Sequence, residues 1–150
     1  MRKPIPLWLL VASLIFLSFG GLYGGILMLT DPSGKSLQMD SVLPQLLVPN
    51  YILPGLFLLF VMGLTPLFLT FGLLARPNWP RLQSLSPRRH WAWTATLALG
   101  ILLILWLTLQ AFLIGFQWPI QYVTAINGLL IILFALIPQV RTYFESPVNS

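Results

Sequence analysis

The chain has 150 residues, of which 57% are hydrophobic and only 7% are charged. A soluble domain carries about 25% charged residues, so this composition excludes an ordinary water-facing surface and favours the lipid bilayer as solvent. The absence of cysteine excludes disulfides, thiolate metal sites and thiol redox chemistry, and the basic residues behind the net charge of +5 lie scattered between apolar runs rather than in a nucleic-acid-binding patch.

Four apolar runs follow one another along the chain. They lie at about residues 7–29, 51–75, 91–115 and 119–140. A helix needs about 20 residues to cross the hydrocarbon layer, whereas a membrane β-strand alternates in polarity, which these runs do not. We therefore predict an all-α fold, an integral membrane four-helix bundle, formed by one domain that spans residues 1–150.

The first run is preceded by Arg2 and Lys3, as the apolar core of a secretory signal peptide would be. A cleaved signal has a core of about 7–15 residues followed by a small-residue cleavage site. The run at 7–29 is longer, and no clear A-x-A site follows it. We expect it to be retained as a helix.

A glycine strip lies within this first run: Gly20, Gly21, Gly24 and Gly25. Residues four apart share a helix face, so the two overlapping G-x-x-x-G pairs form a flat surface that another backbone can approach closely. Two interpretations stay open. The strip packs against other helices of the same chain, or it forms a face for a second copy or a partner subunit.

A short polar stretch ends the first run: Asp31, Pro32, Ser33, Gly34 and Lys35. A P-loop also closes in Gly-Lys-Ser, but its first glycine is replaced here by Leu29 and the preceding segment is a helix, so we expect no nucleotide site. Asp, Pro and Gly at the first, second and fourth positions are typical of a type I β-turn. We interpret the stretch as a turn that opens a loop at 30–50, with a short helix near 36–43. The alternative is a binding loop for a lipid head group or a partner, using Asp31 and Lys35.

The second run contains Pro66 at mid-membrane depth. Proline lacks an N–H, so we expect a kink here and a carbonyl group that a neighbour or a hydroxyl must satisfy.

Basic residues predict the orientation of the bundle. Seven of the eight fall on one side: Arg2, Lys3, Arg76, Arg81, Arg88, Arg89 and Arg141. Lys35 alone lies on the other. Cytoplasmic loops carry an excess of Lys and Arg, so we expect both termini and the loop at 76–90 in the cytoplasm, with the loop at 30–50 outside a bacterial inner (plasma) membrane. The four arginines of the 76–90 loop are expected to anchor it on anionic lipid.

His90 is the only histidine and stands beside Arg89 at the expected membrane boundary. Ligation of a haem or pigment is one interpretation, and a solvated interfacial side chain is the other. No cluster of metal-ligating residues accompanies it in the sequence, so we expect no metal site and no cofactor.

The third and fourth runs carry the few polar side chains expected inside the membrane: Trp106, Gln110, Thr124 and Asn127. Counted from the hairpin tip near residue 117, Gln110 and Asn127 differ in depth by about 4–5 Å at 1.5 Å per residue, which permits a side-chain hydrogen bond. One interpretation is that these groups hold helices together. The other is a small polar pocket that opens to the outer leaflet, with Trp106 as its aromatic wall.

Three stretches carry a resemblance to a protein family. They read ILMLTDPSG at 26–34, YILPGLFLL at 51–59 and WLTLQAFLIGFQWPIQ at 106–121. The chain resembles a widespread group of small uncharacterised bacterial four-helix membrane proteins that share a DPSG turn after helix 1, an LPG start to helix 2 and a WxxxQ in helix 3. It departs from the group at 118–121, where Trp-Pro-Ile-Gln replaces Trp-Leu-Gln-Pro. The resemblance implies the fold and topology and transfers no catalytic residue.

The residues expected inside the membrane exclude several functions. Proton-coupled transport usually needs an ionisable group within the membrane, and none of the four runs has one. The outer loop offers only Asp31 and Asp40 as bases for hydrolysis, so we do not expect an enzyme. We expect a non-catalytic multi-pass protein that acts through protein or lipid partners, as a homo-oligomer or an accessory subunit of a larger membrane complex, and binds no nucleic acid. The alternative is a protein that binds or transports a lipid or small apolar molecule in the pocket near Trp106.

Overall fold

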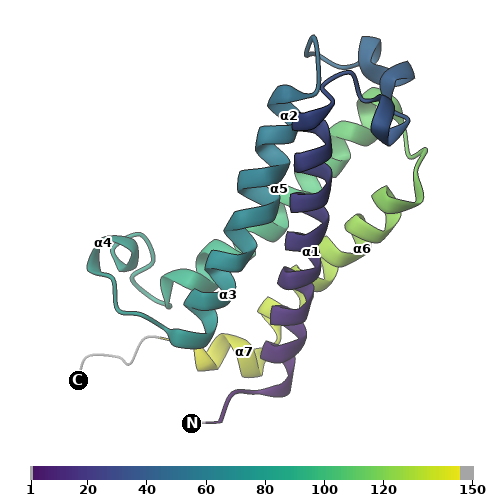
Figure 1. Cartoon of the computed structure of the whole chain (residues 1–150). Helices are drawn as coiled ribbons and strands as arrows, with labels where there is room; N and C mark the ends of the chain where they lie inside the picture. The colour runs from purple at the N-terminus through teal and green to yellow at the C-terminus, as the bar shows by residue number, and fades with distance from the viewer. Residues whose placement is uncertain (1, 146–150) are drawn as a thin grey trace.

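The computed structural model describes residues 2–145, and the chain is helical with no β-strand within that range (Figure 1). Four spans are long and apolar enough to cross a membrane. They are α1 (Ile5–Thr30), a compound second span of α2 (Ile52–Phe57), η3 (Leu58–Leu64) and α3 (Thr65–Ala75), α5 (Trp91–Ile114) and α6 (Pro119–Leu136). The short helices are η1 (Lys35–Leu37), η2 (Asp40–Gln45), α4 (Pro80–Gln83) and α7 (Pro138–Tyr143). The predicted all-α fold is confirmed.

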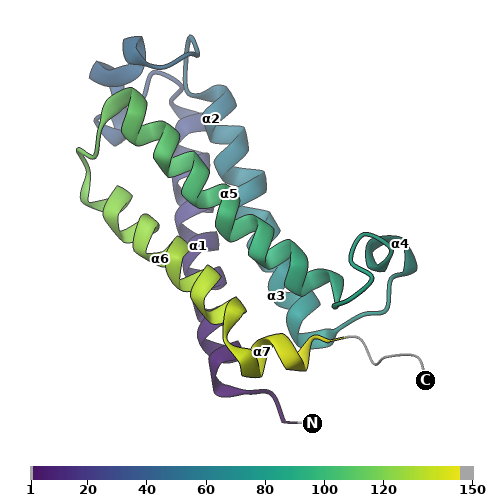
Figure 2. The same cartoon turned by 180° about the vertical axis from the view of Figure 1, so that it is seen from behind.

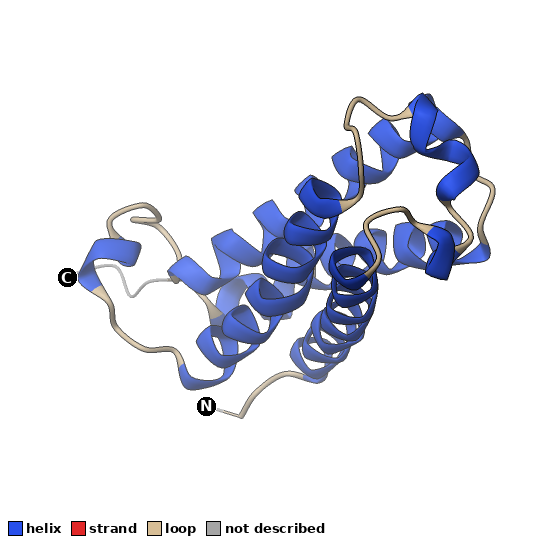
Figure 3. Ribbon diagram, turned by 45° about the horizontal axis from the view of Figure 1, so that its top comes forward, coloured by secondary structure: helices blue, strands red, loops and turns tan. Residues whose placement is uncertain are grey.

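The four spans pack around a ring, in which α1 contacts the second span and α6, and α5 contacts α3 and α6 (Figures 1 and 2). We call the end that holds the 30–50 loop and the turn at 115–118 the loop end. The opposite end holds the start of α1, the 76–90 loop and α7, and we call it the terminal end. η1 and η2 lie over the loop end (Figure 3). They occupy the part of the loop where a short helix was expected near 36–43.

The second span contains a π-helical turn, η3, where a simple kink was expected. The missing N–H of Pro66 breaks the regular bonding pattern of an α-helix. Here the Thr65 N–H donates to the Phe60 carbonyl five residues earlier, and the Thr65 hydroxyl donates to the same carbonyl at 2.9 Å. The Ser18 hydroxyl of α1 donates to the Gly63 carbonyl at 2.7 Å. As expected, hydroxyl groups donate hydrogen bonds to the carbonyl groups near this proline, and one of the hydroxyl groups belongs to a neighbouring helix.

The fourth span is shorter than expected. The helix predicted at 119–140 is interrupted at Ile137, because α6 ends at Leu136 and α7 starts at Pro138. Ile137 adopts φ −56° and ψ 131°, the extended conformation that a following proline favours. The break turns α7 beneath the terminal end of the bundle, where Val140 and Phe144 are fully buried (Figure 2).

The densest packing lies in the terminal half. The apolar side chains with no exposed surface there are Leu7, Leu10, Leu14, Leu73, Ala92, Ile131, Ala135, Val140 and Phe144. They come from α1, α3, α5, α6 and α7, so every span contributes to one core. The Trp93 indole N–H donates to the Ala135 carbonyl at 2.8 Å and ties α5 to α6 within this core.

Candidate functional site

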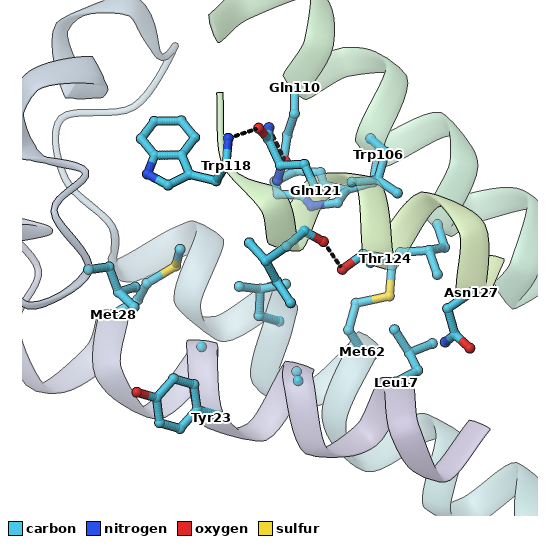
Figure 4. Close-up of a pocket in the computed structure, with 18 of the residues that line it drawn as sticks. Leu17, Tyr23, Met28, Met62, Trp106, Gln110, Trp118, Gln121, Thr124 and Asn127 are labelled. Carbon is cyan, nitrogen blue, oxygen red and sulfur yellow. Dashed lines mark hydrogen bonds between the residues drawn. The ribbon is translucent and has the colours of Figure 1, made fainter. Parts of the chain in front are cut away.

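A cavity of about 410 Å³ lies in the loop half of the bundle (Figure 4). Its deep wall is apolar and includes Leu17 of α1, Met62 of η3 and Leu103 of α5. Leu37 and Met39 from the 30–50 loop also line it. The cavity is therefore enclosed by all four spans and covered by the loop.

The cavity opens sideways between α1 and α6. Phe16 and Tyr23 of α1 and Ile120 of α6 line it, and each of these side chains is more than half exposed. At this end α6 leans away from α1 in both side views (Figures 1 and 2). A molecule beside the bundle therefore reaches the cavity without passing through the loop.

The glycine strip of α1 is divided between two tasks. A Cβ atom at Gly21 would lie 2.6 Å from the Gly63 nitrogen, and one at Gly25 would lie 2.7 Å from the Leu59 nitrogen. These two glycines pack against the second span of the same chain. Gly20 and Gly24 both line the cavity. A Cβ atom at Gly20 would meet nothing within 4 Å among the described residues. Gly20 and Gly24 therefore keep the cavity open.

The predicted pocket residues, Trp106, Gln110, Thr124 and Asn127, all line this cavity. The hydrogen bond that their depths permit between Gln110 and Asn127 does not form, however. The Asn127 side-chain amide faces α1 and donates to the Ser13 carbonyl at 3.1 Å. Gln110 instead accepts from the side-chain amide of Gln121 at 3.3 Å, because Gln121 stands closer to the hairpin tip. The Thr124 hydroxyl donates to the Ile120 carbonyl of its own helix (Figure 4).

Gln121 organises the polar end of the cavity and was not among the residues that the sequence indicated. Its Oε1 accepts the backbone N–H groups of Gln117 at 2.9 Å and Trp118 at 3.1 Å. Its Nε2 donates to Gln110 Oε1 and to the Gly115 carbonyl, both at 3.3 Å. The sequence feature that could have indicated Gln121 is its position as the third residue of a helix that begins at a proline. A glutamine at this position can accept hydrogen bonds from the backbone just before the helix.

A second cavity of about 120 Å³ lies beside the first, between α5, the start of the second span and residues 46–48. Trp106 and Gln110 line both cavities. The Trp106 ring packs on Phe57, with the two ring centroids 4.5 Å apart. Trp106 therefore borders two spaces, whereas the pocket interpretation of the sequence placed it on the wall of one.

The stretch 31–35 forms the expected turn above the site, closed by a hydrogen bond from the Gly34 N–H to the Asp31 carbonyl at 3.1 Å. The Ser33 hydroxyl and then the Ser36 hydroxyl and N–H donate to the Asp31 carboxylate and lower its pKa to about 2. The Lys35 side chain is exposed. The hydroxyl groups of Ser33 and Ser36 therefore stabilise the turn itself, through hydrogen bonds to the Asp31 carboxylate.

Tyr51 fixes this turn over the bundle. Its N–H donates to the Pro32 carbonyl at 2.9 Å, and its hydroxyl donates to the Met39 carbonyl at 2.8 Å. Gly34 has φ +79°, and a Cβ atom there would lie 2.8 Å from Tyr51 Cδ2, so glycine suits both the backbone and the contact. Burial raises the pKa of the Tyr51 hydroxyl, which keeps it a donor.

The four arginines of the 76–90 loop divide into two pairs. Arg81 and Arg88 are exposed at the terminal end. The Arg76 guanidinium lies 4.7 Å from the Tyr143 ring centroid, and Arg89 forms a salt bridge with Glu145 at 3.3 Å. Arg76 and Arg89 therefore join the loop to α7 and the residues after it, a role that the sequence did not reveal.

His90 uses both ring nitrogens within the fold. Nδ1 accepts the Ala92 N–H at 3.3 Å, so Nε2 carries the proton and donates to the Pro77 carbonyl at 3.2 Å. Burial lowers the pKa of His90, which favours this neutral ring. A haem iron or a pigment metal could bind a His90 ring nitrogen only by displacing one of these two hydrogen bonds.

Comparisons with protein-family models, with curated proteins and with solved structures find no match to this chain. The resemblance to small bacterial membrane proteins stays an expectation, and the cavity is the feature from which a function follows.

Proposed function

We propose that the chain is a non-catalytic multi-pass membrane protein that binds a lipid or another small apolar molecule entering sideways from the bilayer. The cavity carries this proposal. Its volume of about 410 Å³ falls within the roughly 300–1,000 Å³ of ligand pockets. Its mouth lies between two membrane-length helices, so bilayer lipid is the molecule present there at the highest concentration.

Membrane insertion is supported by the surface of the four spans. Large apolar side chains such as Phe19 and Phe112 are exposed on it, at 70% and 87% of their surface. Such a surface is unfavourable in water and favourable in lipid. The gathering of Arg and Lys at the terminal end supports cytoplasmic termini in a bacterial inner membrane, and the cavity then opens in the outer leaflet.

The partner-subunit hypothesis draws less support from the glycine strip. Gly21 and Gly25 are occupied by the second span, and Gly20 and Gly24 border the cavity. A role as an accessory subunit or homo-oligomer stays a prediction, and the same measurement tests it.

The experiment compares two leucine substitutions by native mass spectrometry of protein purified in mild detergent. Gly20→Leu places a side chain into the cavity, where a Cβ atom meets nothing within 4 Å. Ala98→Leu adds the same bulk on the exposed face of α5, away from the cavity. We expect an apolar adduct on the wild type and on Ala98→Leu, and its loss from Gly20→Leu.

Two results would contradict the proposal. A wild-type protein that carries no adduct, even after incubation with lipid vesicles, binds nothing in the cavity. An adduct retained in full by Gly20→Leu sits elsewhere. A dimer or a defined partner in the same spectrum, lost on Gly20→Leu, would support the accessory-subunit hypothesis instead.

A further inference from the structure

The cavity is polar at its loop end and apolar below. Gln110 and Gln121 stand within about one turn of the α5–α6 connection. Leu103 lies seven residues before Gln110 on the same helix, which places it about 10 Å deeper at 1.5 Å per residue. Asn127 is deeper too, but its amide already donates to the Ser13 carbonyl. A ligand that fits this gradient has a polar end toward the loop and an apolar remainder.

The orientation of the Gln110 amide follows from its neighbours. Two backbone N–H groups donate to Gln121 Oε1, so Gln121 must turn its NH₂ group toward Gln110. Gln110 then has to present its oxygen to Gln121, which leaves its own NH₂ group for something else. This series of hydrogen bonds begins at backbone N–H groups, which can only donate. The orientation of both side-chain amides therefore follows from their partners and does not depend on how oxygen and nitrogen were placed at either glutamine.

Two donors on α5 therefore border the cavity without a hydrogen-bond partner among residues 2–145. They are the Gln110 NH₂ group and the indole N–H of Trp106, one helical turn away. Polar groups that leave water are normally hydrogen-bonded. A pair of adjacent donors calls for an acceptor, such as a carbonyl oxygen, on the ligand.

The absence of charged side chains from the cavity lining within residues 2–145 narrows the chemical class of the ligand further. The cavity is lined by apolar and uncharged polar side chains, with no Asp, Glu, Lys or Arg among the described residues that border it. An ion buried without a countercharge is strongly unfavourable, so a carboxylate, phosphate or ammonium group is excluded from this end of the cavity.

We infer that the cavity selects an uncharged amphiphile whose polar end carries a carbonyl acceptor, such as a neutral fatty acyl ester. Trp106 and Gln110 hold the carbonyl oxygen, and the hydrocarbon chain lies along Leu103 and Leu17. This inference rests on the proposed function and adds the chemical class of the ligand to it.

The experiment uses three probes with the same saturated chain: methyl hexadecanoate, hexadecane and hexadecanoate. Occupancy of the purified protein is measured for each probe by native mass spectrometry at matched concentrations in one detergent. We expect the ester to bind more tightly than the alkane by about twofold to tenfold for each hydrogen bond it gains. The carboxylate should bind most weakly of the three, at a pH where it is ionised.

Two matched variants test the donors. Trp106→Phe keeps an aromatic wall but removes the N–H, and should lower the preference for the ester over the alkane by about twofold to tenfold. Trp8→Phe makes the same change on an exposed residue at the terminal end and should behave as the wild type. Equal binding of ester and alkane, or an ester preference that survives Trp106→Phe, would overturn the inference but leave the proposed function standing. Failure of every probe to bind would overturn both.

Discussion

The terminal half and the loop half of this bundle are built from similar apolar helices, yet they pack differently. In the terminal half, side chains from every span are fully buried, and α7 closes the base of the bundle. In the loop half, the same helices separate around a cavity of about 410 Å³. The loop half is open because Gly20 and Gly24 stand at positions where larger side chains would fill the space.

Under the proposed function, the terminal half supplies stability and the loop half supplies the binding site. Empty space within a protein costs packing energy, because the atoms that border it lose neighbours. Membrane helices associate largely through such packing, so a large void is expensive for a bundle of this size. The terminal half must therefore supply the stability that holds the cavity open.

The largest expected effect tests this division directly. Leu10→Ala, in the terminal core, should lower the free energy of unfolding by about 2–5 kcal/mol. Leu37→Ala, beside the cavity and only partly buried, should lower it by about 1 kcal/mol or less. Unfolding of both variants in mixed micelles provides the measurement. Equal losses would show that the two halves stabilise the fold equally.

A second test sharpens the comparison within two adjacent residues. Gly21→Ala forces a Cβ atom against the backbone of Gly63, at 2.6 Å from its nitrogen. The resulting overpacking should destabilise the protein by about 1–3 kcal/mol. Gly20→Ala makes the same change toward open space, and should stabilise the helix by about 0.5–1 kcal/mol because alanine restricts the unfolded chain. Thermal unfolding in one detergent compares them, and destabilisation by Gly20→Ala would contradict an open cavity wall.

The smallest effect concerns the turn over the loop half. The hydrogen bonds from Ser33 and Ser36 lower the pKa of Asp31 from 3.8 to about 2. Because the folded state favours the carboxylate, this contribution to stability is present in full above pH about 3.8 and is lost as the pH falls through about 2. Ser33→Ala should raise the pKa toward 3.8, as followed by carbon NMR of the Asp31 carboxyl group. Ser84→Ala, in the 76–90 loop, should leave that titration unchanged, and an unmoved pKa in Ser33→Ala would refute the hydrogen-bond account.

The sequence predicts the four spans because length and hydropathy are local properties. The turn at 31–34 is predictable for the same reason, since Asp, Pro and Gly each favour one position of a β-turn. The break at Ile137 was also signalled locally, by Pro138, but the apolar run continues across it and hides the change of direction.

Side-chain partners were less predictable. The four spans are apolar on all sides, so periodicity does not show which face of each helix turns inward. Their depths permitted a hydrogen bond between Gln110 and Asn127, but the Asn127 amide donates to Ser13 of α1 and Gln110 accepts from Gln121. The hydroxyl that serves Gly63 likewise comes from Ser18, a residue 45 positions away.

Four residues line both cavities: Met28, Met39, Trp106 and Gln110. Trp106 borders both the larger space and the smaller one beside residues 46–48, and it is held in place by its contact with Phe57. For the proposed ligand, rotation of the Trp106 side chain would join the two spaces and admit a longer hydrocarbon chain without any movement of the helices.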